Sequence, residues 1–329
     1  MSNAAVWRVN NNPALVNNCA HCFTDLQDAA SDPFVTIGDT LHLEPSPVSY
    51  GDLTLTKRLV IIGPGFLLGQ GTANNPGLQA NNGVAMIHGL TLNAGSDGSK
   101  ITGVVIGDGT NFGGIAIENA NNITLDRNFH WARGINFNGT GITGFTITRC
   151  YFQAAGITTP NFSQVVSNVV ISNNFFSQVI ALDNTFSNVV ISNNLFHWNG
   201  QHSPFGAEVK NNIFVLGSVA VNNNNIHHNA ASGANGLPAG NSNLNSVVFT
   251  NVFDPAFTSD DQKWRLSPTY LTYMNLVGDD LTVPGMYGGA TPYRPSGVPA
   301  IPAVYQLAAP NTAIQGDPIN VTIGTRSND

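Results

Sequence analysis

One group of charged residues near the middle of the chain could perform acid–base chemistry. It consists of Asp126, Arg127, His130 and Arg149. A carboxylate, an imidazole and two guanidinium groups in one groove could remove a proton next to a sugar carboxylate, as in a polysaccharide lyase. A structural interpretation competes with this one, because a carboxylate between two arginines forms a simple ion pair far more often than a catalytic site. We predict the structural role and keep catalysis as the alternative.

Aromatic residues beside this group could bind carbohydrate. The tripeptide FHW begins at Phe129 and again at Phe196. An exposed indole ring covers the apolar face of a pyranose, and neighbouring polar groups orient the sugar. The candidate binding residues are Trp131, Arg133, His197 and Trp198. The alternative is structural packing at strand ends, which we favour because the two copies stand one position out of register in the repeat described below.

The remaining acidic residues give no sign of a preformed metal or cofactor site. A calcium-dependent lyase needs several carboxylates on one strand face. The acids of the central segments do not share a face; they are Asp108, Glu118, Asp126, Asp183 and Glu208. We therefore predict no metal and no cofactor, and calcium enters only with the lyase alternative. The pairs Asp260–Asp261 and Asp279–Asp280 are predicted to be solvated turn residues rather than the carboxylates of a glycoside hydrolase.

The three cysteines are expected to be structural. Cys19 and Cys22 form a C-x2-C pair, and Cys150 stands alone. A zinc site would need a second pair of ligands nearby, and His21 is poorly placed to join both cysteines. We predict a local disulfide or buried thiols for the pair.

Composition excludes several classes of protein. Only 9% of the 329 residues are charged, and the net charge is −7 with lysines and arginines scattered singly. Nucleic acid is therefore not an expected partner, because no basic stripe could neutralise phosphates. No apolar run is long enough to span a membrane, and the start of the chain lacks the pattern of a signal peptide. If the protein is exported, its signal is absent from this chain.

A repeat of about twenty residues predicts the strands and turns that position these groups. The repeated segments are ITLDRNFH from Ile123, FTITRCYF from Phe145, VVISNNFF from Val169, VVISNNLF from Val189, AEVKNNIF from Ala207 and AVNNNNIH from Ala220. Alternating apolar residues, a two-residue polar corner and a second apolar strand describe one coil of a β-solenoid. Stacked corners would then form two ladders. The first holds Arg127, Arg149, Asn173, Asn193, Asn211 and Asn224, and the second holds Asn128, Cys150, Asn174, Asn194, Asn212 and Asn225.

Two further stretches carry a resemblance to a known family. FTDLQDAASDPFVTIGDTLHLEPSPVSYGDLTLTKRLVIIGPG, from Phe23, resembles the opening coils of secreted bacterial β-helix proteins of the pectate-lyase-like superfamily. LSPTYLTYMNLVGDDLTVPGMYGGATPYRPSG, from Leu266, is similar to their closing coil, although Val283 and Pro284 depart from its pattern. The resemblance covers most of residues 23–298. It implies an all-β, right-handed parallel β-helix with an N-terminal capping helix and an irregular C-terminal cap, and it implies no single activity.

These observations predict three regions and a ranked set of functions. We expect an N-terminal strand and capping helix in 1–37, solenoid coils in 38–260, and a closing coil with a C-terminal cap in 261–329. The predicted function is a non-catalytic, secreted or cell-surface module that adheres to a surface or binds polysaccharide along one coil face. A polysaccharide lyase or glycoside hydrolase is the alternative. Ice binding is a minor alternative, suggested by a flat column of outward residues. The column contains Thr124, Thr146, Val170, Val190, Glu208 and Val221.

Overall fold

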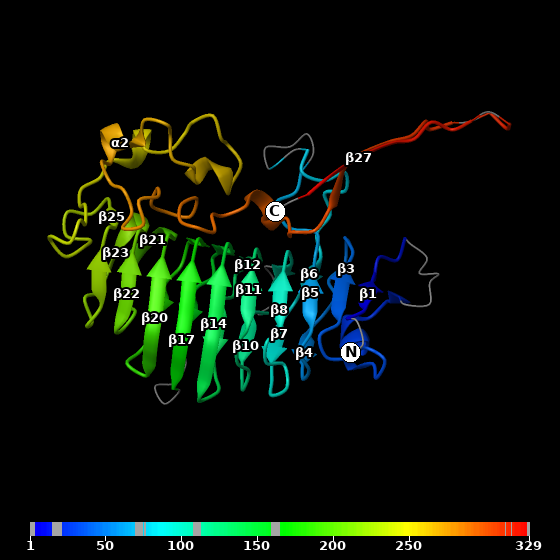
Figure 1. Ribbon diagram of the computed structural model, residues 1–329, viewed down its shortest axis with the longest axis horizontal. Coiled ribbons are helices and arrows are strands. Elements are labelled where there is room, and N and C mark those ends of the chain that lie inside the picture. The colour runs from blue at the N-terminus through cyan, green and yellow to red at the C-terminus, as the bar shows by residue number, and fades with distance from the viewer. Residues whose placement is uncertain are drawn as a thin grey trace.

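The chain winds into a parallel β-solenoid with three sheets (Figure 1). A computed structural model describes residues 4–14, 22–69, 75, 77–107, 113–158, 165–312, 314–316 and 318–327. Successive coils pair strand to strand in parallel, and each sheet grows by one strand per coil. The predicted solenoid is therefore confirmed.

We name the sheets by their strands in spatial order. Sheet 1 contains β2 (Cys22–Phe23), β1 (Val6–Val9), β3 (Thr40–Leu43), β5 (Val60–Ile62), β8 (Lys100–Thr102), β11 (Thr124–Asp126), β14 (Ile142–Thr148), β17 (Val166–Ser172), β20 (Phe186–Ser192), β22 (Ala207–Lys210) and β24 (Asn225–His227). Sheet 2 contains β25 (Ala230–Ala231), β23 (Ile213–Val219), β21 (Leu195–His202), β18 (Phe175–Phe176), β15 (Tyr151–Gln153), β12 (Phe129–Trp131), β9 (Val105–Ile106) and β6 (Met86–Ile87). Sheet 3 contains β19 (Ile180–Ala181), β16 (Ile157–Thr158), β13 (Ile135–Phe137), β10 (Ile115–Ile117), β7 (Leu90–Leu92) and β4 (Leu53–Leu55).

The core is a set of apolar columns that run along the solenoid. Alternate residues of each strand face inward, so paired strands bring like side chains into contact. In sheet 2, the rings of Phe152, Phe176, Phe196 and Phe214 stack with centroids 4.5–5.4 Å apart. At the N-terminal end, helix α1 (Leu26–Ser31) begins at the capping side chain of Asp25 and buries its apolar face against the same core.

A ladder of buried side chains lies at the corner between sheets 1 and 2. The side-chain oxygens of Asn174, Asn194, Asn212 and Asn229 each accept the backbone N–H of the ladder residue one coil earlier, at 2.8–3.0 Å. Each amide nitrogen donates to a backbone carbonyl near 2.9 Å. The chain can turn sharply here because the preceding residue adopts a left-handed conformation, with φ of 53–58° from Arg149 to Asn211. The predicted ladder is confirmed for these coils.

The last rung of that ladder corrects the sequence alignment. Strand β24 pairs with β22 so that Ile226 lies beside Val209 and His227 beside Lys210. The corner therefore falls at His228 and Asn229, and not at Asn224 and Asn225 as the repeat predicted. The run of four asparagines misled the alignment, because the observed rung, Asn229, lies four residues after the run, in the register that buries Ile226.

The cysteines occupy structural positions. Cys22 is disulfide-bonded, and Cys19 lies outside the described residues. Cys150 is free and fully buried in the ladder, where its thiol donates to the carbonyl of Thr148 at 3.3 Å. Burial raises the pKa of this thiol, so it stays protonated and unreactive.

After the last coil the chain turns back and covers one face of the solenoid. This covering segment, residues 249–302, contains η1 (Phe249–Asn251), η2 (Gln262–Trp264), α2 (Tyr270–Tyr273) and η3 (Pro295–Gly297). It runs along the ladder corner toward the N-terminal coils, as the orange trace in Figure 1 shows. Its side chains Met286 and Tyr293 pack on the outward residues Phe129, Tyr151 and Phe175 of sheet 2. These outward residues of sheet 2 are therefore buried, whereas Trp131 on the same face stays 41% exposed.

Buried polar groups fasten the covering segment. Asp261 is fully buried and accepts hydrogen bonds from the Ser296 backbone at 2.6 Å, the Tyr293 hydroxyl at 3.2 Å and the Asn75 amide at 2.8 Å. The sequence predicted a solvated turn residue at Asp261, and that prediction is wrong. Asp260 does remain exposed and pairs with Lys263 at 3.2 Å.

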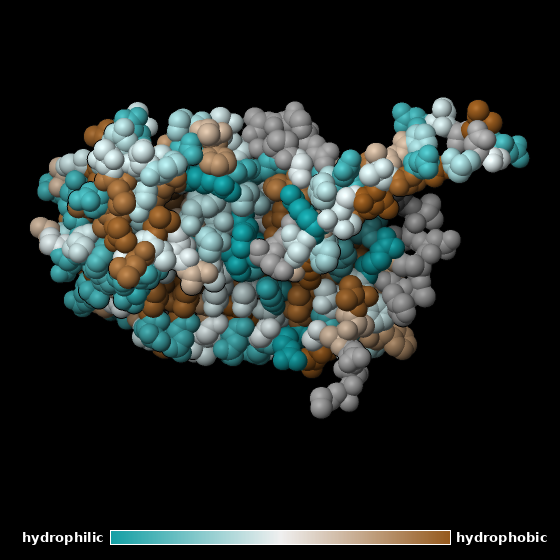
Figure 2. All heavy atoms as spheres, turned by 45° about the horizontal axis from the view of Figure 1, so that its top comes forward, coloured by the Kyte–Doolittle hydropathy of each residue, from teal (hydrophilic) through white to brown (hydrophobic). Residues whose placement is uncertain are grey.

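The chain then forms an antiparallel hairpin that projects from the body. It consists of β26 (Ala303–Ala308) and β27 (Thr322–Arg326). The hairpin is attached at its base, where Arg326 donates to the Leu78 carbonyl and Ala80 donates to the Val304 carbonyl. Figure 2 shows apolar side chains along it, and Leu307 and Ile323 are about three-fifths exposed, at 62% and 60%. Within the described residues, no helix is long and apolar enough to cross a membrane.

We expect the ladder to carry a large share of the stability. The Asn194→Ala variant removes two donated and two accepted hydrogen bonds in a fully buried site. Because the former partners stay buried, the free energy of unfolding should fall by about 3 kcal/mol or more. Urea denaturation measures this loss, and Asn199→Ala, an exposed change in the same strand region, is the control. Equal, small losses in both variants would contradict a role for the ladder.

Candidate functional site

The charged group predicted from the sequence does assemble, but the covering segment buries most of it. Asp126 lies 2.8 Å from Nε of Arg149, 3.8 Å from Nε of Arg127 and 3.8 Å from Nζ of Lys100. The side chains of Asp126 and Arg127 are only 4% exposed. Arg127 also donates to the Val298 carbonyl of the covering segment at 2.8 Å. The Asp126 carboxylate therefore neutralises the positive charges of the stacked Arg127 and Arg149. Arg127 also holds the covering segment through its hydrogen bond to Val298.

His130 is separated from this group by the direction of its side chain. It lies in the inward column of sheet 2, fully buried, with its ring stacked on Phe152 at 4.1 Å. Burial lowers the pKa of His130 to about 3, so the ring is neutral at ordinary pH. Among the described residues neither ring nitrogen has a hydrogen-bond partner. His130 therefore faces the core, whereas Asp126 follows the inward Leu125 on β11 and faces the opposite side of its own sheet.

The two FHW copies do not form one platform. Strand pairing through sheet 2 aligns Phe129 with Leu195, and His130 with Phe196. The predicted displacement by one position is thus observed. His197 is half-buried beside Trp264, with ring centroids 5.2 Å apart, and burial next to Lys263 lowers its pKa.

The two tryptophans differ in accessibility. The indole of Trp198 is half-buried against Gly200, where even a methyl group would collide with it. Trp131 is 41% exposed and stands edge-on to Phe129, so it retains a surface that a sugar could cover. Of the aromatic binding candidates, Trp131 is therefore the more accessible.

A hollow with several polar lining residues is a groove of about 520 Å³ on the outer face of sheet 3. It crosses β4, β7, β10 and β13, and its volume is ordinary for a ligand site. Its lining residues are Asp52, Thr54, His88, Gly89, Leu90, Thr91, Gly113, Gly114, Ile115, Ala116, Arg133 and Asn136. Arg133, a binding candidate from the sequence, therefore lies in the groove.

Small residues create the groove. Thr54, Thr91 and Ala116 stack in register along its floor. At its edge, backbones approach so closely that a Cβ on Gly113 would stand 1.5 Å from the His88 carbonyl oxygen. A Cβ on Gly134 would likewise stand 1.7 Å from the Gly156 carbonyl oxygen. Glycine is required at these positions because any side chain would push the coils apart.

Polar side chains line one border of the floor, and Asn136 lies in the floor beside Ala116. Nδ1 of His88 lies 2.7 Å from Oδ1 of Asp52, whose side chain is 74% exposed. Nε2 of His88 is buried and has no hydrogen-bond partner within the described part of the chain. Arg133 is exposed at the same border, and Asn136 accepts from the Thr158 hydroxyl at 2.8 Å. The groove thus offers donors and acceptors of the kinds that bind sugar hydroxyls and carboxylates.

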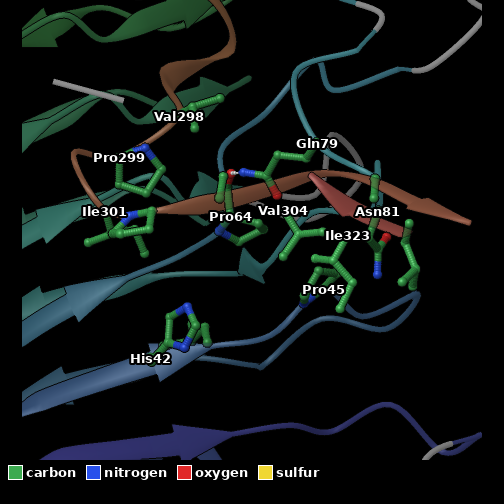
Figure 3. A pocket seen from close by; sticks show the side chains of 15 residues that line it. His42, Pro45, Pro64, Gln79, Asn81, Val298, Pro299, Ile301, Val304 and Ile323 are labelled. Atoms are coloured by element: carbon green, nitrogen blue, oxygen red, sulfur yellow. Dashed lines mark hydrogen bonds between the residues drawn. The ribbon is translucent and has the colours of Figure 1, made fainter. Parts of the chain in front are cut away.

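A second hollow, of about 490 Å³, lies at the base of the hairpin (Figure 3). Pro45, Pro64, Ile301 and Ile323 point toward it, and Gln79 at its rim donates to the Pro64 carbonyl at 2.5 Å. His42 is the one titratable side chain in its described lining. The hollow therefore offers few groups to orient a polar ligand.

No protein-family model matches this sequence, and neither a curated protein nor a solved structure is significantly similar to it. The fold and its geometry define the molecule as a parallel β-solenoid with one sheet covered by its own C-terminal segment. No known protein therefore indicates an activity for this chain. Its function has to be inferred from the surfaces that remain accessible.

Sequence reasoning found some of the groove and missed the rest. Arg133 was named from the sequence as a binding candidate, and it lines the groove. Asp52 and His88 were missed, since they lie in different coils and outside the repeated segments. The sequence carries one signal for the groove, a set of glycines where the backbones of neighbouring coils approach closely. These are Gly89, Gly113, Gly114 and Gly134.

We expect His130→Phe to change the pH dependence of stability. In the unfolded chain this histidine has its ordinary pKa of about 6.5, whereas in the folded chain the pKa is about 3. Between these values only the unfolded state takes up the proton, so lowering the pH costs about 1.4 kcal/mol per pH unit for this residue. The phenylalanine variant loses that term and extends the phenylalanine stack.

Urea denaturation at pH 7 and pH 5 measures the effect. The stability gained by His130→Phe should be larger at pH 5 than at pH 7. His202, also buried with its pKa lowered to about 3, remains in both proteins and cancels in the comparison. A gain independent of pH would show that His130 is not held neutral in the core.

Proposed function

We propose that this protein is a secreted or cell-surface module that binds a polysaccharide chain in the groove of sheet 3, without catalysing its cleavage. The observation that carries the proposal is the lining of that groove. A carboxylate–imidazole pair, a guanidinium group and an amide border a floor of small side chains. Such a floor lets a flat, extended ligand lie close to the strands, while polar borders orient it.

The direction of the groove also suits a chain ligand. Its floor residues repeat once per coil, about 4.8 Å apart, from Thr54 through Thr91 and Ala116 to Asn136. A linear polymer lying across the strands would meet similar groups at regular intervals. Trp131 stands across the Ala132 corner from Arg133 and supplies an exposed ring near one border.

Two features support a location outside the cell. Cys22 is disulfide-bonded, and disulfides persist mainly in oxidising compartments. The surface is covered largely by amides and hydroxyls, because only 9% of residues are charged. A non-catalytic role is supported by the Asp126 group, whose charges pair with one another and with the covering segment.

Binding to a panel of acidic and neutral polysaccharides tests the proposal. Affinity electrophoresis and titration calorimetry should detect binding of at least one polymer, and Arg133→Ala and Asp52→Asn should each weaken it about tenfold or more. A tenfold loss corresponds to about 1.4 kcal/mol, an ordinary value for one charged hydrogen bond. Arg58→Ala, which removes an exposed arginine outside the groove, should bind like the parent protein.

The same incubations, with and without calcium, separate binding from cleavage. Unsaturated products and new reducing ends are followed over time, and neither should form. Product formation that disappears in a folded Arg149→Ala variant would overturn the proposal in favour of a lyase. Binding that persists in both groove variants would place the ligand on another surface.

A further inference from the structure

The observed register of the last coil brings together side chains that lie far apart in the sequence. Lys210 of β22 lies beside His227 of β24, and both face outward from sheet 1. Glu208 lies two residues before Lys210 on the same face. Asp279 reaches this point from the covering segment, where Asn211 donates to its Oδ1 at 2.7 Å. The alignment from sequence alone placed Val221 beside Glu208, so it hid this cluster.

The cluster contains three potential metal ligands. Nε2 of His227, a carboxylate oxygen of Glu208 and one of Asp279 all lie within 4.8 Å of one another. Oε1 of Glu208 is 3.4 Å from Nε2 of His227. These side chains are 16–36% exposed, so the ligand atoms are accessible to an ion from solvent.

Lys210 is the cation that this cluster now holds. Its Nζ lies 3.3 Å from Oε1 of Glu208 and 3.0 Å from Oδ2 of Asp279. Two carboxylates are thus held close together by one flexible ammonium group, which can swing away into solvent.

We propose that Glu208, His227 and Asp279 form a Zn²⁺ site in which the metal replaces the ammonium group of Lys210. One imidazole and two carboxylates, with water as a fourth ligand, are an ordinary zinc donor set. Tetrahedral ligands stand about 3.3 Å apart, given metal–ligand distances near 2.0–2.1 Å. Departure of the ammonium group allows the carboxylates to close to that separation.

His228 completes the site by orienting the ligand His227. The Nδ1 atoms of the two rings lie 3.0 Å apart, so one of them must carry the hydrogen between them. When Nε2 of His227 binds a metal, its Nδ1 is protonated and donates to Nδ1 of His228. Such a hydrogen bond fixes the tautomer and ring direction of a metal-binding histidine.

The site would join the covering segment to the last coil. Glu208 and His227 belong to the solenoid, whereas Asp279 belongs to the covering segment. A bound ion would therefore link two parts of the chain that are distant in sequence, and it would stabilise the folded state by mass action. The zinc site does not depend on the proposed binding of polysaccharide.

Titration of metal-stripped, full-length protein with ZnCl₂ tests the site. Calorimetry should show one Zn²⁺ per chain, and thermal unfolding should shift to higher temperature as zinc is added. His227→Ala, Glu208→Gln and Asp279→Asn should each weaken binding at least tenfold and abolish the thermal shift. Lys210→Met removes the competing ammonium group and should tighten binding several-fold.

His42→Ala is the matched control, since His42 faces outward in the same sheet at its opposite end. It should leave zinc affinity unchanged. The proposal is overturned if no stoichiometric binding occurs, if His227→Ala binds zinc like the parent, or if His42→Ala loses affinity equally. Circular dichroism establishes that each variant is folded, and the tighter binding of Lys210→Met cannot arise from unfolding.

Discussion

The structure depends on satisfying the backbone N–H groups where the chain turns between sheets 1 and 2. At that corner the strand pairing of both sheets ends, and the N–H group that follows points into the core. An unpaired buried N–H is costly, and a side-chain oxygen from the next coil accepts each one. The accepting amide in turn donates to a carbonyl of an earlier coil. Asparagine provides both functions in a side chain short enough to remain inside the turn, which explains its repetition.

This corner also determines where function can lie. Its left-handed residues face outward, and the covering segment returns along them. Asn173 donates to the carbonyls of Met286 and Gly288, and Arg127 donates to the carbonyl of Val298. Arg127, one of the charged residues selected from the sequence, thus joins the solenoid to the covering segment. The covering segment packs on much of the outer face of sheet 2, whereas sheets 1 and 3 keep faces open to solvent. The polar groove and the proposed zinc cluster lie on those two sheets.

The sequence predicted most of the fold because period-two strands and paired amides are local signals. It failed where local signals were degenerate or distant. The run from Asn222 to Asn225 resembled a corner of the repeat, whereas the observed corner lies beyond it at His228 and Asn229. The contacts of the covering segment join residues such as Asn173 and Met286, 113 positions apart, and no periodicity reports them. Arg133 was recognised as a binding candidate without its groove, and Asp52 and His88 meet only through the stacking of coils.

Hydrogen–deuterium exchange with and without a bound polysaccharide tests most directly whether function lies on the uncovered face. Because exchange reports protection along the whole chain, it requires no assumption about which residues bind. The account predicts added protection in the segments around Asp52, His88, Gly114 and Arg133, with the ladder residues already protected before the ligand is added. Protection gained instead around Arg127 and Arg149, with loosening of the covering segment, would contradict it.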